Sequence, residues 1–233
     1  MQRTALLLLV ATFPSLASAQ GFEGAAGEFQ YQKYDDGAGF EVDSVEGYLD
    51  AGWGFGRMGA QLGLTLGKEI DSSADIDLRQ YNGLTAHLTF DVSDSLRLGA
   101  MALADNQTDD IAFYAAEALY TAGPLRVEGR LGDSLDTDDF TLVEARGTYA
   151  IGSALSARAG YQYSDFGVDG SYRVLSLGAG YQINDGMEVY ADLSRHKNDT
   201  GAGGTYQGNL FNLGVRFNLG GDDGRLFTYQ PLN

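Results

Sequence analysis

Charged side chains recur at alternate positions in several segments of this chain. Arg126, Glu128 and Arg130 form one such run, and Glu144 and Arg146 form another. Alternate residues of an extended strand point to the same face, so these charges would share one face. Arginines and carboxylates along a polar passage can orient passing solutes through their electric field. The same charges can instead pair with one another and fill the space, and the sequence leaves both arrangements open.

The charged face extends over most of the chain when this alternation is followed from segment to segment. The residues assigned to it are Arg79, Arg97, Arg126, Arg130, Arg146, Arg158, Arg216, Glu46, Asp50, Glu117, Glu128, Glu144, Glu188 and Asp192. Glycines such as Gly52, Gly63 and Gly160 occupy further positions on this face. Because glycine has no side chain, it leaves room beside the charges.

The residues that usually carry catalysis or bind metals are scarce. His87 and His196 are the only histidines, and neither has a nearby serine and carboxylate in the pattern of a catalytic triad. The acidic segment from Asp71 to Asp77 does not match a calcium-binding loop, and the chain has no cysteine. We therefore expect no enzymatic activity, no cofactor and no metal.

The elements that position the charged face have a period of two residues, which predicts β-strands. Leu155, Ala157 and Ala159, for example, alternate with Ser156 and Arg158. We count about twelve such segments, and they begin near residues 25, 43, 57, 78, 96, 111, 125, 140, 154, 171, 187 and 206.

Short and long connections alternate between these segments. Tight turns are expected at 54–56, 91–95, 121–124, 150–153 and 182–186, and longer polar loops at 35–42, 67–77, 104–110, 132–139, 164–170 and 195–205. This arrangement is typical of an all-β, antiparallel, up-and-down transmembrane β-barrel of about twelve strands, with short periplasmic turns and longer extracellular loops.

An aromatic residue on the apolar face closes almost every second strand just before its short turn. The set is Trp53, Phe90, Tyr120, Tyr149, Tyr181 and Phe217. Aromatic rings at one height are typical of the boundary between lipid headgroups and hydrocarbon. The alternative is a soluble barrel or sandwich that packs Trp53 and the other rings into a core.

A closed barrel would place the eighth strand opposite the second. Arg126, Arg130, Arg146 and Arg158 would then face Glu46 and Asp50 across the lumen, with Glu188 and Asp192 nearby. Opposite charges on facing walls would create a transverse field, whereas Glu117, Glu128 and Glu144 could neutralise the arginines locally.

The N-terminal segment has the pattern of a secretory signal peptide. Arg3 precedes a short apolar run from Ala5 to about Phe13, and a small-residue stretch ends at Ala19. The run is shorter than the roughly 20 residues of a membrane helix. We expect a signal peptide at 1–19, a barrel at 20–219 and a tail at 220–233. The formal charge of −17 makes nucleic acid an unsuitable partner.

On this evidence the chain resembles the Gram-negative outer-membrane porins and their smaller relatives. The resemblance is carried by the signal peptide, the hairpin meander and the segments RAGYQYSDFG, SLGAGYQINDGMEVYADL and NLFNLGVRFNLG. NLGVRFNL, from Asn212 to Leu219, is similar to the family's signal for the barrel-assembly machinery. Unlike the family's usual terminal aromatic residue, GGDDGRLFTYQPLN follows the last strand here; it could enter the lumen, lie in the periplasm or indicate a different strand count.

The resemblance implies passive diffusion of small hydrophilic solutes across the bacterial outer membrane. Expected partners are outer-membrane lipid and lipopolysaccharide, the assembly machinery and the solutes, and the family allows a homo-oligomer. Acidic loops predict a lean toward cations; their carboxylates are Asp35, Asp36, Glu69, Asp71, Asp75, Asp77, Asp105, Asp109, Asp110, Asp133, Asp136, Asp138 and Asp139. The alternative is a plugged barrel that acts through these loops in a structural or surface-interaction role.

Overall fold

The computed structural model shows a closed antiparallel β-barrel of twelve strands. It describes residues 21–74, 78–105, 112–134, 140–201, 203–219 and 226–227, so the expected signal peptide at 1–19 lies outside the described residues. The strands are β1 (Phe22–Asp35), β2 (Glu41–Phe55), β3 (Met58–Ser72), β4 (Gln80–Ser93), β5 (Leu96–Asp105), β6 (Ala112–Ala122), β7 (Leu125–Ser134), β8 (Thr141–Ile151), β9 (Leu155–Asp165), β10 (Gly170–Asn184), β11 (Met187–Thr200) and β12 (Thr205–Asn218).

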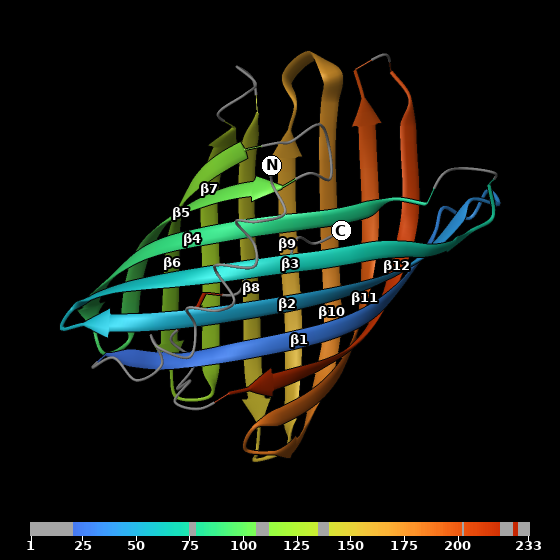
Figure 1. Cartoon of the computed structure of the whole chain (residues 1–233). Helices are drawn as coiled ribbons and strands as arrows, with labels where there is room; N and C mark the ends of the chain where they lie inside the picture. Colours follow the sequence, from blue (N-terminus) through green and yellow to red (C-terminus); the bar gives the residue numbers. More distant parts are fainter. Residues whose placement is uncertain are drawn as a thin grey trace, which may run out of the picture.

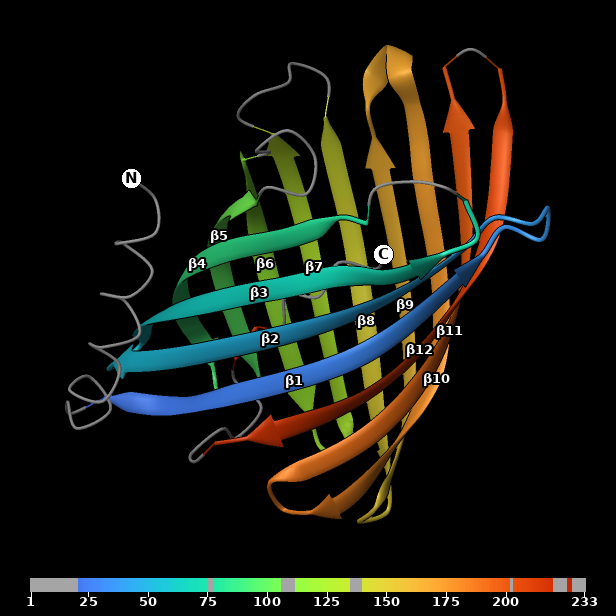
Figure 2. The ribbon, with the colours of Figure 1, turned by 45° about the vertical axis from the view of Figure 1, so that its right-hand side comes forward.

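Each strand pairs with its neighbours in sequence, and β1 pairs with β12 to close the ring (Figures 1 and 2). The predicted architecture and strand number are confirmed. The largest difference between a predicted and an observed strand start is three residues, at β1, where the prediction was 25 and the strand begins at Phe22. Closure matters because a barrel leaves no strand edge unpaired.

Short turns and longer loops alternate, as predicted. Gly56 and Gly123 have positive φ angles of 75° and 56° at two of the short turns, a conformation that glycine adopts without strain. At the opposite end, β3 continues to Ser72 and β11 to Thr200, where longer loops were expected. Polar residues there still pair between strands: Arg195 on β11 donates to Asn209 and Gln207 on β12. Among the described residues, no helix is long and apolar enough to cross a membrane.

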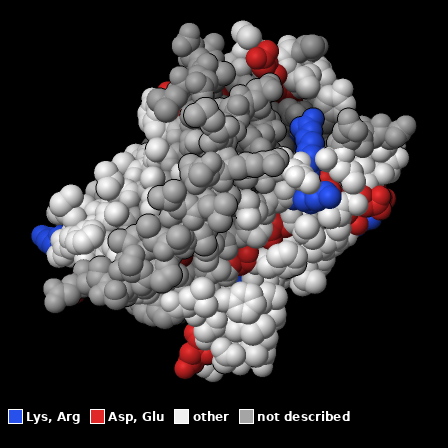
Figure 3. All heavy atoms as spheres, in the orientation of Figure 1, with Lys and Arg blue, Asp and Glu red and all other residues white. Residues whose placement is uncertain are grey.

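The two faces of the wall differ as the alternation predicts. On β4, Leu84 and Leu88 are exposed, whereas Thr85 and His87 between them are buried. The outward positions elsewhere are also rich in exposed leucine, valine and aromatic residues. In the view of Figure 3, described charged atoms are visible at the left, right and lower edges and also nearer the centre, between white atoms. An apolar outer wall of this kind suits hydrocarbon and leaves the polar residues to the lumen.

The aromatic residues before the short turns are not all alike. Phe90, Tyr120, Tyr149, Tyr181 and Phe217 are exposed, with 39% to 52% of each residue accessible. Trp53 is only 7% exposed, although its register partner Ala60 lies on the outward side of β3. Its ring packs edge to face against Phe22 on β1, with 6.3 Å between the ring centroids.

One part of the lumen is apolar, which the alternation of charges did not predict. Met101 and Leu103 on β5, Phe113 on β6 and Leu142 on β8 form a buried cluster, and Phe140 packs against it. These residues lie toward the end with the longer loops. Apolar packing therefore fills one side of the lumen there, and the polar space lies on the other side.

Candidate lumenal pathway

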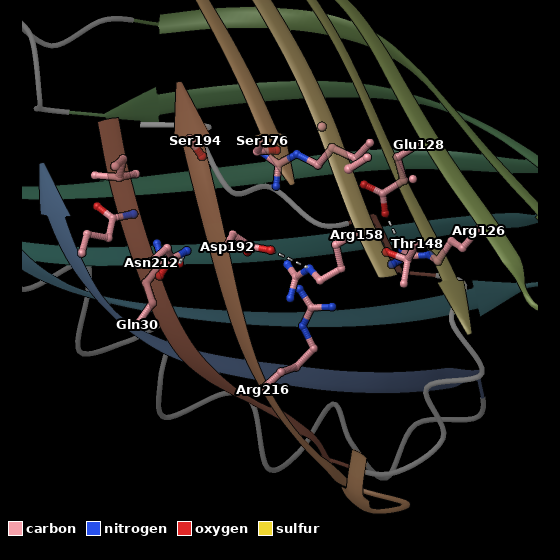
Figure 4. A pocket seen from close by; sticks show the side chains of 16 residues that line it. Gln30, Arg126, Glu128, Thr148, Arg158, Ser176, Asp192, Ser194, Asn212 and Arg216 are labelled. Carbon is pink, nitrogen blue, oxygen red and sulfur yellow. Dashed lines mark hydrogen bonds and ion pairs between the residues drawn. The ribbon is translucent and has the colours of Figure 1, made fainter. Parts of the chain in front are cut away.

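Two cavities lie inside the barrel, and they share lining residues. The central cavity has a volume of about 70 Å³ and is lined by four arginines, Arg126, Arg146, Arg158 and Arg216, together with Glu128, Asp192 and neutral polar residues (Figure 4). The outer cavity has a volume of about 410 Å³ and lies toward the longer loops. Gln32 and Leu210 line both cavities, so this pair lies between the two spaces.

The outer cavity is lined largely by rings. Tyr34, Tyr81, Tyr172, Tyr206 and His196 contribute to it. The Tyr172 hydroxyl and His196 Nδ1 are hydrogen-bonded, and the Tyr34 and Tyr172 rings meet the imidazole edge to face at 5.8 and 5.6 Å. His196 is 4% exposed, and its Nε2 has no hydrogen-bond partner among the described residues. Within the described residues, His196 Nε2 is thus a buried polar atom that is surrounded by aromatic rings and lacks a hydrogen-bond partner.

Glu46 lies where the two cavities approach each other, and neutral groups satisfy its carboxylate. Gln30 Nε2 donates to Glu46 Oε2 at 2.5 Å, Gln32 Nε2 does so at 3.4 Å, and the hydroxyls of Tyr48 and Tyr81 also donate. Hydrogen bonds from several donors can stabilise a buried carboxylate without an arginine. The second predicted acidic residue of this wall, Asp50, accepts from Gln61 Nε2 at 3.2 Å.

The arginines contact carboxylates on adjacent strands. Arg130 on β7 donates to Glu117 on β6 at 2.6 Å and to Glu144 on β8 at 3.2 Å. These three residues are register partners, which is why their side chains meet. His87 Nδ1 lies 2.7 Å from Glu117 on its other side, and Arg146 also pairs with Glu144. Arg130 and Arg146 thus have local carboxylate partners on the same or adjacent strands.

The remaining predicted charges are distributed along the lumen. Arg216 pairs with Glu28 at 2.8 Å, and Arg126 pairs with Glu128. Near the short turns, Arg97 binds both Asp91 and Glu23, and Glu188 accepts from Ser156 at 2.8 Å. Arg79 lines the outer cavity. The pairing of Arg158 with Asp192, at 3.5 Å, spans the central cavity wall and is visible in Figure 4.

Several inward residues were not among the predicted ones because only charged residues were selected. Gln30 and Asn212 line the central cavity, and Tyr190 is buried on the same inward face; Tyr190 donates to Glu28 and Gln30, and Asn212 donates to Gln30 at 2.6 Å. Arg158 lies over the Tyr190 ring, 4.0 Å from its centroid. Strand parity carried a signal for all three, since they alternate with apolar outward residues. Leu210 gave no such signal, because it is an apolar residue on the inward face.

Part of the tail lies within the lumen. Leu226 and Phe227 are 5% and 1% exposed, and Phe227 bonds to Gln61 on β3. Of the alternatives for residues 220–233, the described part fits the lumen, and the rest of the tail lies outside the described residues. Among the acidic loop residues, Asp75, Asp77, Asp109, Asp110, Asp136, Asp138 and Asp139 also lie outside them. No group of side chains suited to a metal ion occurs within the described ranges.

A closed barrel with an apolar outer wall and a polar lumen defines the class of outer-membrane β-barrel proteins. A family model of Gram-negative porins matches residues 73–201, which is more than half of the chain. The chain belongs to this porin family. No curated protein sequence matches it.

Several solved structures with similar folds are outer-membrane porins and channels. The KdgM porin shares 8% sequence identity, with 82% of this chain and 98% of that chain covered and a TM-score of 0.56. The NanC porin shares 10% identity with the same coverage and TM-score. An outer membrane channel from Pseudomonas putida F1 shares 16% identity, with 86% and 97% covered and a TM-score of 0.58. At such low identity these structures support the fold alone.

Family membership gives the coarse function and location. The chain is a porin-like protein of the outer membrane, and its family points to transport and not to catalysis.

Proposed function

We propose that this protein is a narrow outer-membrane channel for the passive diffusion of small hydrophilic solutes, with a preference for cations. The observation that carries the proposal is that the outer and central cavities lie next to each other inside the barrel and share the lining residues Gln32 and Leu210. A solute entering among the rings of the outer cavity would pass this pair and reach the charged central cavity. The small size of the central cavity limits passage to small solutes.

The wall of this pathway is suited to hydrated polar solutes. Its arginines pair with carboxylates such as Glu128 and Asp192, and around the central cavity four arginines outnumber these two acidic residues. Arg158, Arg216 and Asp192 extend into the central cavity (Figure 4). Such groups can replace part of a solute's hydration shell while the path stays wet.

The preference for cations rests on the loops. Asp35, Asp36, Glu69 and Asp71 lie at the end of the outer cavity, and the formal charge of the chain is −17. An acidic mouth raises the local concentration of cations and lowers that of anions. The effect should weaken as salt is added, because the screening length falls to about 8 Å at physiological ionic strength.

We place the N-terminus and the short turns in the periplasm and the longer loops outside the cell, after export and removal of residues 1–19. The exposed apolar wall would contact outer-membrane lipid and lipopolysaccharide, and Asn212 to Leu219 would present the signal read by the assembly machinery. The alternation of short turns and longer loops supports this orientation, and the apolar band supports the contact with lipid.

The second candidate is a plugged barrel that acts through its surface. The paired network around Arg130 and the buried dipeptide Leu226–Phe227 favour it. Such a protein would insert and fold without conducting ions.

Single-channel recording in planar bilayers under a salt gradient tests the proposal. We expect discrete openings with a reversal potential on the cation-selective side. Leu210→Trp should reduce the conductance several-fold because the indole would narrow the junction of the two cavities. Leu213→Trp is the matched control, since Leu213 is exposed on the outer wall of the same strand. A folded and inserted protein that stays silent, or equal currents in both variants, would contradict the proposed pathway.

A further inference from the structure

The outer cavity occupies one side of the lumen. Its described lining comes from β10–β12, β1–β4 and the residues next to them, whereas the buried apolar cluster on the other side comes from β5, β6 and β8. The volume of about 410 Å³ falls within the range of roughly 300–1,000 Å³ that is usual for small-molecule sites. The cavity is therefore large enough to hold a small organic solute.

Aromatic rings form much of this lining. Those of the described residues belong to Tyr34, Phe40, Tyr81, Tyr172 and Tyr206. A side chain at Gly208 would collide with the Tyr34 ring, and a side chain at Gly67 would collide with the Tyr81 ring. These two rings thus lie along the wall, over residues that have no side chain, and the space between the rings stays open.

The face of an aromatic ring attracts positive charge. Its π electrons make the face partially negative, so a cation within about 6 Å of the ring centroid is stabilised, and several rings around one space are a known means of binding ammonium groups. The same kind of contact occurs deeper in the lumen, where the Arg158 guanidinium lies 4.0 Å from the centroid of the Tyr190 ring. A space lined by rings therefore suits an organic cation better than an anion.

The charges of the lining favour the same class of solute. Glu46 and Glu69 contribute carboxyl groups, and Arg79 contributes a guanidinium. Arg79 lies beside one of these acidic residues, because its backbone N–H donates to Glu69 Oε2 at 2.9 Å. Asp35 and Asp36 add negative charge at the end of β1 nearest the cavity. Acidic surroundings of this kind raise the local concentration of cations.

A buried nitrogen atom of the lining lacks a partner. His196 is 4% exposed, and among the described residues its Nε2 has no hydrogen-bond partner, while its Nδ1 is bonded to the Tyr172 hydroxyl. A buried polar atom without a hydrogen bond is unfavourable. Since His196 lines the cavity, a solute that carries an N–H or O–H group can supply the missing bond, whereas a purely apolar solute cannot.

We propose that the outer cavity is a binding site for a small organic ammonium ion. The charge of the ion lies among the rings of Tyr34, Tyr81, Tyr172 and Tyr206, and its N–H or O–H group bonds to His196 Nε2. The site names a class of solute for the proposed channel, and its effect on currents rests on that function. A bound ion occupies the space next to the central cavity, so it should interrupt the flow of smaller ions.

Choline and its uncharged isostere dimethylbutanol test the role of the charge, since they share their shape and a hydroxyl group. Binding is measured by saturation-transfer NMR on the refolded protein in detergent micelles, and currents are recorded in planar bilayers with and without choline. Tyr206→Leu removes one ring of the cavity, and Tyr206→Phe keeps the ring. Tyr161→Leu is the matched control, because Tyr161 is an exposed tyrosine on the outer wall of β9.

Tetramethylammonium tests the role of His196, because it carries the charge but no N–H or O–H group. It should bind equally well to the unmodified protein and to His196→Phe, which keeps a ring and removes Nε2. Choline should bind to His196→Phe several-fold more weakly than to the unmodified protein. Equal binding of choline to both would overturn the bond assigned to His196.

We expect choline to bind saturably and to interrupt the currents, and dimethylbutanol to bind several-fold more weakly. Tyr206→Leu should weaken choline binding several-fold, and Tyr206→Phe and Tyr161→Leu should not. Equal binding of choline and dimethylbutanol, or choline binding that Tyr206→Leu leaves unchanged, would overturn the site. Open currents in a protein that does not bind choline would overturn the site and leave the channel intact. Choline binding at this site in a folded protein that stays silent would overturn the channel and leave the site intact.

Discussion

Arg158 and Asp192 meet over the strand that separates them, with 3.5 Å between Arg158 Nε and Asp192 Oδ1. Arg158 lies on β9 and Asp192 on β11, and Gly178 on β10 is the register partner of both. A side chain at Gly178 would collide with the Asp192 carboxylate. Glycine at this one position is therefore what allows the two charges to form a pair on the wall of the central cavity.

Breaking this pair should change the charge selectivity of the channel. Arg158→Ala would leave the Asp192 carboxylate without its counter-charge at the narrow cavity, so both conductance and cation preference should rise, the latter several-fold. Asp192→Asn should shift selectivity toward anions. The reversal potential in a salt gradient measures both effects.

Arg195→Ala provides the control for that experiment. It removes the same charge from β11, but Arg195 is exposed and bonds to Asn209 and Gln207 on the outer side of the wall. A selectivity change in Arg195→Ala as large as that in Arg158→Ala would argue against the central cavity as the selective element.

Contact between the apolar outer wall and lipid is the basis of a second prediction. Leu213→Arg should impair folding into vesicles, because a basic residue on the lipid face of a barrel costs about 2–4 kcal/mol at the bilayer midplane. Asn212→Arg places the same residue one position earlier, on the inward face that lines the central cavity. The folded fraction, read from the heat-dependent shift on gel electrophoresis, should fall for Leu213→Arg only. Equal folding of both variants would mean that this side of β12 does not contact lipid.

The alternation of residues was sufficient to predict the strands, their turns and the two faces of the wall. It left the partners of the arginines open, because these depend on register. Arg130 could face the second strand across the lumen or pair locally, and its neighbours in register, Glu117 and Glu144, bind it. Two nearby carboxylates on adjoining strands outcompete a more distant one, since Coulomb attraction falls with separation.

The positions of the tail and of the apolar cluster could not be predicted from sequence patterns, for a different reason. A dipeptide such as Leu226–Phe227 has no period, and its place depends on space left by Gly52 and Gly99 in distant strands. Likewise, Met101 and Phe113 occupy inward positions, where parity alone predicts polar residues. Only the three-dimensional structure shows that apolar side chains pack one side of the lumen and that the other side is open.

The ion pairs around Arg130 should matter for stability. Its guanidinium is buried between Glu117 and Glu144, so Arg130→Met would deprive two buried carboxylates of a shared partner and leave them only His87 and Arg146. Loss of one partner from a buried pair costs about 3–5 kcal/mol, and the free energy of unfolding in urea should fall by that amount.

Lys33→Met is the matched control for Arg130→Met. Lys33 pairs with Glu41 at 2.6 Å, but both side chains are exposed, and such pairs contribute about 1 kcal/mol or less. If the two substitutions had equal effects on the free energy of unfolding, the network around Arg130 would not stabilise the barrel.

The acidic mouth should keep part of its charge well into the acid range. The Asp36 carboxylate accepts the backbone N–H groups of Ala38 at 2.7 Å and Phe40 at 3.0 Å, and these bonds lower the pKa of Asp36 below its ordinary value of 3.8. A carboxylate whose pKa is lowered by folding stabilises the loop above its unfolded pKa, and this contribution is lost as the pH falls through the lowered pKa. Protection of the Phe40 amide from hydrogen exchange should therefore persist at pH 4 and disappear only below 3.8. Asp36→Ala should remove the protection at every pH, whereas a carboxyl titration of Asp36 centred above 3.8 would show that the backbone bonds do not hold the charge.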